Sequence, residues 1–275
     1  MAPSTAVYNS APAVGFAGQL ARPMEPARVL SLLSLGAVGF GVPVISDLTD
    51  ATERGVDPFS APATADADGI VTALATAATA QSVTGSGLDG AVGATEMFPP
   101  RNITLTLSSH ADYNLTTAYV RGLDENGLPQ EEAFVIPDAG NTTLTGSKFF
   151  SFVTEVYIPA QGGTGGSTQV GFGSKLGPID KHFRGVTLYD ATRPPEAYDA
   201  DEVVPVLEEG TIYVQSETAV DPTKPVYVRL VISGDEVRGA FRATVDSNDL
   251  ARVVRARWVD KTTGAGIAAL RLLPA

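Results

Sequence analysis

Residues 185–230 read GVTLYDATRPPEAYDADEVVPVLEEGTIYVQSETAVDPTKPVYVRL. Runs of β-branched and aromatic residues alternate in this stretch with short breaks made of proline, glycine and acidic residues. Such runs between turn-forming residues predict strands joined by tight connections. The predicted strands are Val186–Tyr189, Val203–Leu207, Thr211–Gln215 and Val226–Ile232. Several short strands this close together indicate a barrel or a sandwich.

The same pattern continues on both sides of this stretch. The apolar run Val29–Ile45 contains several glycines and Pro43, and it is short for a membrane span. We therefore predict a buried pair of strands, Val29–Leu35 and Val42–Leu48, rather than a targeting or membrane segment. Beyond residue 230, further strands are predicted over Val237–Val245, Arg252–Val259 and Gly264–Leu273.

The central part of the chain is rich in threonine, alanine and glycine. Ile103, Leu105 and Leu107 alternate with threonine and serine, which predicts a strand with one buried face. Asp124–Gly127 contains Asn-Gly, a strong hairpin signal. For Ile70–Ala80, the threonine content favours a strand and a loop over a short helix. These features predict a β-sandwich.

The predicted fold is all-β, with a discontinuous β-barrel or jelly-roll-like domain and an inserted β-sandwich domain. The C-terminal part has few strands of its own, so we expect it to pair with residues 29–48. Residues 29–59 and 179–275 would form this domain, residues 60–178 would project outward as the insert, and residues 1–28 would be an extended arm. Insertions are tolerated where two chain ends lie close together on a surface.

Composition limits the possible functions. The chain of 275 residues contains no cysteine, which excludes disulfides, thiol nucleophiles and cysteine-based metal sites. Its formal net charge is −12, opposite in sign to that of a broad nucleic-acid surface. An acidic surface suits solubility, or docking onto a basic surface.

Motifs that carry chemistry are weak in this sequence. Gly85–Gly90 matches G-x-G-x-x-G, but no helix is predicted after it, so we interpret it as a loop. Asp66–Gly69 resembles part of a calcium loop, but the required ligand positions fall on Thr64 and Ala75. His110 and His182 are assigned to different domains. We predict no catalytic, cofactor-binding or metal-binding residue.

The acidic run Asp190–Glu209 is interpreted as a solvated face or a docking surface. Arg252, Arg255 and Arg257, near Trp258, form the one basic focus of the sequence. This cluster could meet an acidic neighbour, including the acidic segment of a second copy of the chain. The alternative interpretation is that these are ordinary strand charges.

Several stretches, in their order along the chain, carry a family resemblance. They are Val14–Leu20 (VGFAGQL), Gly185–Asp190 (GVTLYD), Val203–Leu207 (VVPVL), Gly210–Val214 (GTIYV) and the ending from Arg255 to Leu272. Together they resemble the head decoration or structural cement proteins of tailed bacteriophages. The resemblance covers about residues 7–50 and 181–275. The insert is similar to the Thr/Gly-rich β-modules of phage virion proteins.

The resemblance implies a non-catalytic virion protein on the outer capsid surface, where it binds the major capsid protein and clamps neighbouring capsomers. It implies small oligomers, with a trimer favoured and a dimer possible, and neither nucleic acid nor membrane as partner. No cofactor is expected. The candidate inter-subunit contacts are Val14, Phe16, Leu20, Arg252, Arg255, Arg257 and Trp258.

Two other functions stay open at this point. The insert could be a carbohydrate-binding or cell-surface-binding module, alone or together with the capsid role. A secreted β-rich hydrolase could use the carboxylates of Asp190–Glu209. Glycan binding by residues 60–178 would favour the first of these alternatives. Carboxylate substitutions among Asp190–Glu209 that leave all measurable activity unchanged would count against the second.

Overall fold

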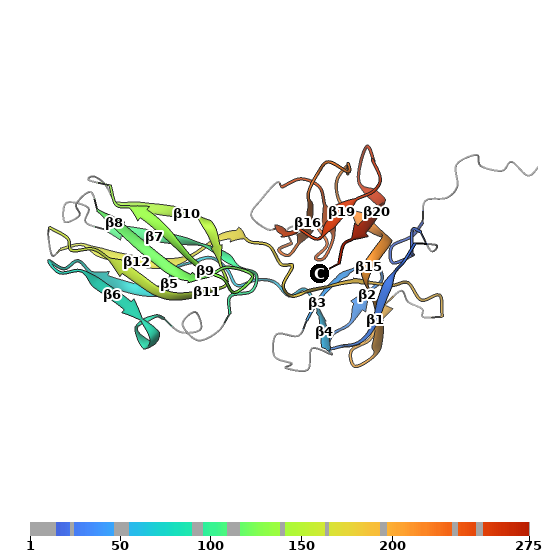
Figure 1. The fold of residues 1–275 in the computed structure, drawn as a ribbon, viewed down its shortest axis with the longest axis horizontal. Coiled ribbons are helices and arrows are strands. Elements are labelled where there is room, and N and C mark those ends of the chain that lie inside the picture. The colour runs from blue at the N-terminus through green and yellow to red at the C-terminus, as the bar shows by residue number, and fades with distance from the viewer. Residues whose placement is uncertain are drawn as a thin grey trace, which may run out of the picture. The chain divides into compact units, whose positions relative to one another are not determined.

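The computed structural model describes residues 15–22, 25–46, 55–89, 96–108, 116–137, 141–162, 165–192, 197–232, 236–245 and 250–274. The regular elements of these residues are strands, apart from one short 3₁₀ helix, η1, at Gly85–Gly87 (Figure 1). The predicted all-β class is therefore confirmed, and a five-stranded barrel is among its sheets. No helix in this described part of the chain is long and apolar enough to cross a membrane.

The chain divides into two compact units, each assembled from segments that are far apart in the sequence. The first unit contains the described residues of Met1–Pro58, Arg184–Lys224 and Ala256–Pro274. The second unit contains those of Phe59–Phe183 and Pro225–Arg255. Segments from both ends of the chain therefore fold together, although Pro225–Arg255 groups with the central block. The domain boundaries given above stay a prediction.

The longest strand of the first unit, β15, runs over Val203–Ser216. Its first half pairs antiparallel with β1 (Arg28–Ser34) and with β13 (Phe183–Thr187). From Gly210 onward it pairs antiparallel with β20 (Gly266–Leu272). The prediction of two separate strands is wrong here, because one continuous strand pairs first with one set of neighbours and then with another.

The predicted strands near Val29 and Val42 both exist, but they are not neighbours. They are β1 and β3 (Pro43–Ser46), and β4 (Gly55–Pro58) pairs with both of them. The expectation that this pair is buried is only partly met, because Val29 and Leu33 on β1 are 43% and 39% exposed. The remaining strands of the unit are β2 (Val38–Gly39), which pairs with β14 (Ala197–Tyr198), and β19 (Ala256–Trp258), which pairs with β20.

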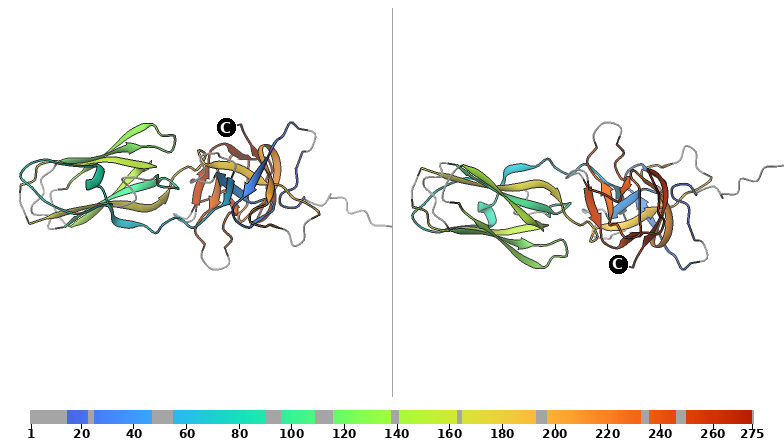
Figure 2. Two further views of the ribbon diagram at one scale, coloured as in Figure 1. Left: turned by 90° about the horizontal axis from the view of Figure 1, so that it is seen from below. Right: turned by 90° about the horizontal axis from the view of Figure 1, so that it is seen from above.

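Eight strands of the second unit form two four-stranded sheets that face each other as a sandwich (Figure 2). The first sheet has the order β10-β7-β12-β5 and the second has the order β6-β11-β8-β9. The strands are β5 (Asp66–Ala75), β6 (Gln81–Thr84), β7 (Arg101–Ser108), β8 (Thr117–Leu123), β9 (Pro129–Val135), β10 (Thr142–Phe150), β11 (Phe152–Ile158) and β12 (Ser167–Leu176).

The core of the sandwich follows the alternation that the sequence predicts. Ile103, Leu105 and Leu107 are at most 2% exposed and pack with buried side chains of the facing sheet, including Val120 and Val156. The predicted hairpin between β8 and β9 is also confirmed, since the strands pair along their length and the Asp124 N–H donates to the Leu128 carbonyl. The stretch after Ile70 is a strand, as the threonine content indicates.

Three short strands complete the second unit: β16 (Val226–Arg229), β17 (Phe241–Arg242) and β18 (Leu250–Val253). β16 pairs antiparallel with both others. The strand predicted over Val237–Val245 is therefore only two residues long. The strand predicted over Arg252–Val259 is divided, because β18 ends at Val253 and β19 begins at Ala256.

Candidate inter-subunit surface

The N-terminal segment 15–22 lies along the second half of β15. The Gly18 N–H donates to the Tyr213 carbonyl (2.8 Å), and the Tyr213 N–H donates to the Gln19 carbonyl (2.8 Å). Leu20 forms an isolated β-bridge with Ile212. This part of the predicted arm is thus held to its own chain. Residues 1–14, and with them Val14, lie outside the described residues, so the reach of the arm to a neighbouring subunit stays a prediction.

Two glycines allow this segment to approach the rest of the first unit. Gly18 and Gly41 have φ values of 84° and 69°, in the left-handed region that glycine adopts readily. A Cβ atom on Gly41 would lie 2.5 Å from the Gly18 nitrogen. Phe16 is anchored beside them, with its ring centroid 4.3 Å from that of Tyr189, yet its side chain remains 47% exposed. Phe16 therefore stands at the surface.

The four predicted residues from Arg252 to Trp258 have different environments. Arg252 and Arg257 are exposed, on β18 and β19 respectively. Arg255 is buried: its guanidinium donates to the Phe183 carbonyl and lies over the Phe183 ring, 4.9 Å from the centroid. Trp258 is 1% exposed. Arg252 and Arg255 belong to the second unit and the other two to the first, so the four residues do not form one surface cluster within either unit.

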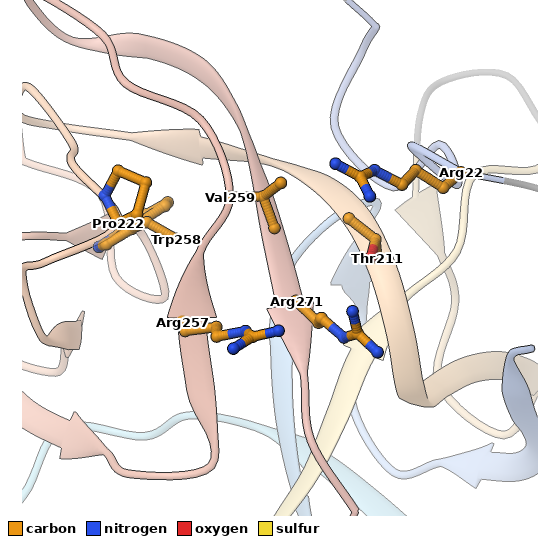
Figure 3. Close-up of a pocket in the computed structure, with 7 residues that line it drawn as sticks. All are labelled: Arg22, Thr211, Pro222, Arg257, Trp258, Val259 and Arg271. Atoms are coloured by element: carbon orange, nitrogen blue, oxygen red, sulfur yellow. The ribbon is translucent and has the colours of Figure 1, made fainter. Parts of the chain in front are cut away.

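A pocket in the first unit gathers three arginine side chains from three separate segments (Figure 3). Arg22 comes from the N-terminal segment, Arg257 from β19 and Arg271 from β20. Arg271 is directly opposite Arg257 on one side and directly opposite Thr211 on the other, so the three lie in one row across the sheet. The cavity has a volume of about 230 Å³, and its other lining residues are Thr211, Pro222, Trp258 and Val259.

Hydrogen bonds position the Arg22 side of this pocket. The Arg22 Nη1 donates to Glu25 Oε1 at 2.8 Å, and the Thr211 hydroxyl donates to Glu25 Oε2 at 3.0 Å. These two donors lower the pKa of Glu25, and the hydrogen bond to Glu25 raises the pKa of Arg22. The positive charge of Arg271 also contributes to the lowering at Glu25. The site thus favours the ionised form of a carboxylate.

Sequence reasoning found Arg257 but missed Arg22 and Arg271. Both lie in stretches of ordinary composition, and only the pairing of β15, β19 and β20 brings them together. One signal was available: Arg257 and Arg271 each sit one residue before an apolar side chain in a predicted strand. Two antiparallel strands can bring such positions opposite each other.

A second surface feature of the first unit is a strip of exposed apolar side chains. Leu33 of β1 and Val203 of β15 are direct cross-strand partners, so their side chains share one face of the sheet. Val29, four residues before Leu33, is on the same face. Their exposed fractions are 39%, 62% and 43%. We call Val29, Leu33 and Val203 the apolar strip.

The described residues give little support for a metal site, a nucleotide-binding loop or a catalytic histidine. Within the described ranges, no three side chains from His, Asp and Glu are grouped so that they could hold a metal ion. Gly85–Gly87 is a single 3₁₀ turn followed by extended backbone at Leu88. His182 lies 3.2 Å from Glu96 Oε1, and His110 lies outside the described residues.

Residues 129–273 match the model of the family described as Structural cement protein (E217 gp24/Pam3 gp6). The chain belongs to this family. No curated protein matches it.

The cement family match extends from β9 to β20. It includes most of the C-terminal region that carried the resemblance, and it also includes residues 129–178 of the central block. It does not include the N-terminal segment. Membership makes this cement protein a structural phage protein of the virion, with a role in stabilising the capsid.

Proposed function

We propose that this cement protein binds the outer surface of the phage capsid, where it clamps neighbouring capsomers formed by the major capsid protein and catalyses no reaction. The observation that carries the proposal is the family match, which covers every strand of the first unit from β13 onward. A structural role of this kind needs surfaces that bind protein rather than a catalytic centre.

The apolar strip is the surface that we assign to the capsid. Exposed apolar side chains that are contiguous mark sites of protein contact. Leu33 and Val203, which are opposite each other, meet this description, and Val29 is exposed on the same face of β1. Both strands, β1 and β15, belong to the unit built from both ends of the chain. Many identical contacts of modest strength across a lattice add up through multivalency.

Retention on purified particles tests the proposal. Phage heads lacking the protein are incubated with the full-length chain, washed and analysed for bound protein, and their resistance to heat is measured. We expect stoichiometric binding to the outside of the head and a higher temperature of disruption. Cryo-electron microscopy that placed the protein inside the head would refute the assigned surface.

A charge in the apolar strip should separate binding from folding. Val203→Lys is expected to lower retention at least tenfold, because it would bury an unpaired charge at the interface. Val135→Lys is the matched control, since Val135 is 65% exposed on β9 of the second unit. Equal loss of retention in both variants would argue against the strip.

One observation favours a second candidate function, in which the sandwich binds a glycan. Tyr119 and Tyr157 are cross-strand partners on the outer face of β8 and β11, with ring centroids 6.2 Å apart. Arg121 lies over the Tyr119 ring and is bonded to Glu131 and Glu155. Aromatic faces beside polar groups suit a sugar ring. A glycan array probed with the protein and with Tyr119→Ala checks this candidate, which fails if the two give the same signals.

A further inference from the structure

The arginine pocket of the first unit holds more positive than negative charge. Arg257 and Arg271 are direct cross-strand partners, and like charges in this position destabilise a sheet. Among the described residues, Glu25 is bonded to Arg22, and the charge of Asp260 also acts on Arg22. Both carboxylates are already engaged, since Glu25 also accepts from Thr211 and the Asp260 Oδ2 accepts a hydrogen bond from the Ala269 N–H.

The chemistry of the pocket selects a carboxylate as its ligand. A guanidinium presents a planar fork of donors that binds a carboxylate through two parallel hydrogen bonds. The described residues contain no hydrogen bond or ion pair from the Arg257 or Arg271 side chain that would occupy these donors. A cavity of about 230 Å³ admits one or two acidic side chains, rather than a whole element.

The chain itself presents a matching acidic turn, which we define as Asp199–Glu202. The turn connects β14 to β15, and Asp199 and Asp201 are exposed. It has a defined shape: the Asp199 N–H donates to Glu202 Oε2 (2.9 Å), and the Asp201 N–H donates to the Ser34 carbonyl (2.7 Å). A turn that is already ordered loses little entropy when it binds.

The turn cannot enter the pocket of its own chain. β15 begins at Val203, directly after the turn, and reaches the pocket only at Thr211. At about 3.3 Å per residue, the turn and the pocket are separated by roughly 25 Å along this strand. Only a second copy can bring the two together.

We propose that the acidic turn Asp199–Glu202 of one copy docks in the arginine pocket Arg22/Arg257/Arg271 of a second copy. The contact joins two different surfaces of the same protein. If two copies exchange it reciprocally, it closes a twofold dimer, and if it runs head to tail, it closes a ring such as a trimer when the rotation between copies permits. This self-association goes beyond the capsid contact proposed above and uses different residues.

A charge-exchange experiment on the full-length protein tests the contact. Oligomer mass is measured by native mass spectrometry and sedimentation, at low and high salt, for Arg257→Glu, Asp199→Lys and the chain that carries both changes. Each single variant should raise the dissociation constant roughly tenfold or more, because it places like charges together. The double variant should recover association, since each contact again joins opposite charges.

Matched controls keep the result specific. Lys175→Glu and Glu125→Lys make charge changes of the same kind at positions in the second unit and should leave the mass unchanged. Thermal unfolding identifies any variant that has lost its fold, in which case the milder Arg257→Gln and Asp199→Asn replace it. Retention on phage heads is measured in parallel, so that a monomeric variant that still binds capsids separates this proposal from the proposed function.

Three results would overturn the proposal. The first is a wild-type protein that stays monomeric at the concentrations used. The second is a pair of single variants that keep the wild-type mass. The third is association that is weakened by Arg257→Glu but not by Asp199→Lys, or that is not restored in the double variant. This result would show that the pocket binds a different segment of the second copy.

Discussion

Replacing Gly41 by alanine is expected to loosen the N-terminal segment from the first unit. The new Cβ would lie 2.5 Å from the Gly18 nitrogen and 2.7 Å from the Ala17 Cβ. These are backbone and Cβ atoms, which no rotation of a side chain can move away. The backbone must therefore shift, and the shift affects the hydrogen bonds that Gly18 makes with Tyr213 and Tyr189.

The magnitude of this effect has two parts. A residue with a Cβ in the left-handed conformation costs about 1–2 kcal/mol, and Gly41 has a φ of 69°. Overpacking of a close contact costs about 1–3 kcal/mol more. The free energy of unfolding of the first unit should thus fall by roughly 2–5 kcal/mol.

The fluorescence of Trp258 measures this change selectively, because the chain contains one tryptophan and it is buried in the first unit. Urea unfolding followed by this signal is compared with that of Gly264→Ala, where a Cβ would meet nothing within 4 Å. That control should change stability by less than about 1 kcal/mol. If Gly41→Ala unfolds at the same urea concentration as the control, residues 15–22 do not pack as described.

Two further predictions concern the second unit. The pKa of Glu96 is lowered, because hydrogen bonds from Lys181 and His182 outweigh the effect of burial, which alone would raise it. The stability that this cluster contributes is therefore present above the ordinary value of 4.5 and is lost as the pH falls below it, so calorimetry should show a smaller loss at low pH in Glu96→Gln than in the wild type. Leu105→Ala should lower the free energy of unfolding by about 2–5 kcal/mol, since Leu105 is fully buried. Thr106→Ala, on the outer face of the same strand, should cost less than about 1 kcal/mol, and similar losses in both variants would contradict the assignment of faces.

The sandwich could be predicted from local signals. In β7, apolar and polar residues alternate with a period of two, which matches the alternation of side chains in a strand. In the β8–β9 hairpin, Gly127 adopts a φ of 77°, which an Asn-Gly turn supplies at little cost. Both signals act between residues that are close in the sequence. They therefore do not depend on which strands of the domain lie next to each other.

The course of β15 shows why local signals fail elsewhere. Glu208, Glu209 and Gly210 are typical of a turn, yet Glu208 is buried and forms an ion pair with Arg28 of β1. Pairing with β1 on one half and β20 on the other keeps the backbone extended through this stretch. Tertiary partners outweigh weak local preference, because each pairing supplies many hydrogen bonds.

The sequence by itself determined the all-β class, the buried face of the sandwich and the family resemblance, since these depend on residue type and on order along the chain. Only the tertiary structure decided which arginines share a pocket. Arg22, Arg257 and Arg271 are separated by up to 249 positions, and the pairing of β19 and β20 together with the course of residues 15–22 beside β15 brings them together. Composition gives the number of charged residues in a chain, whereas the register of its strands determines which charged side chains lie next to each other.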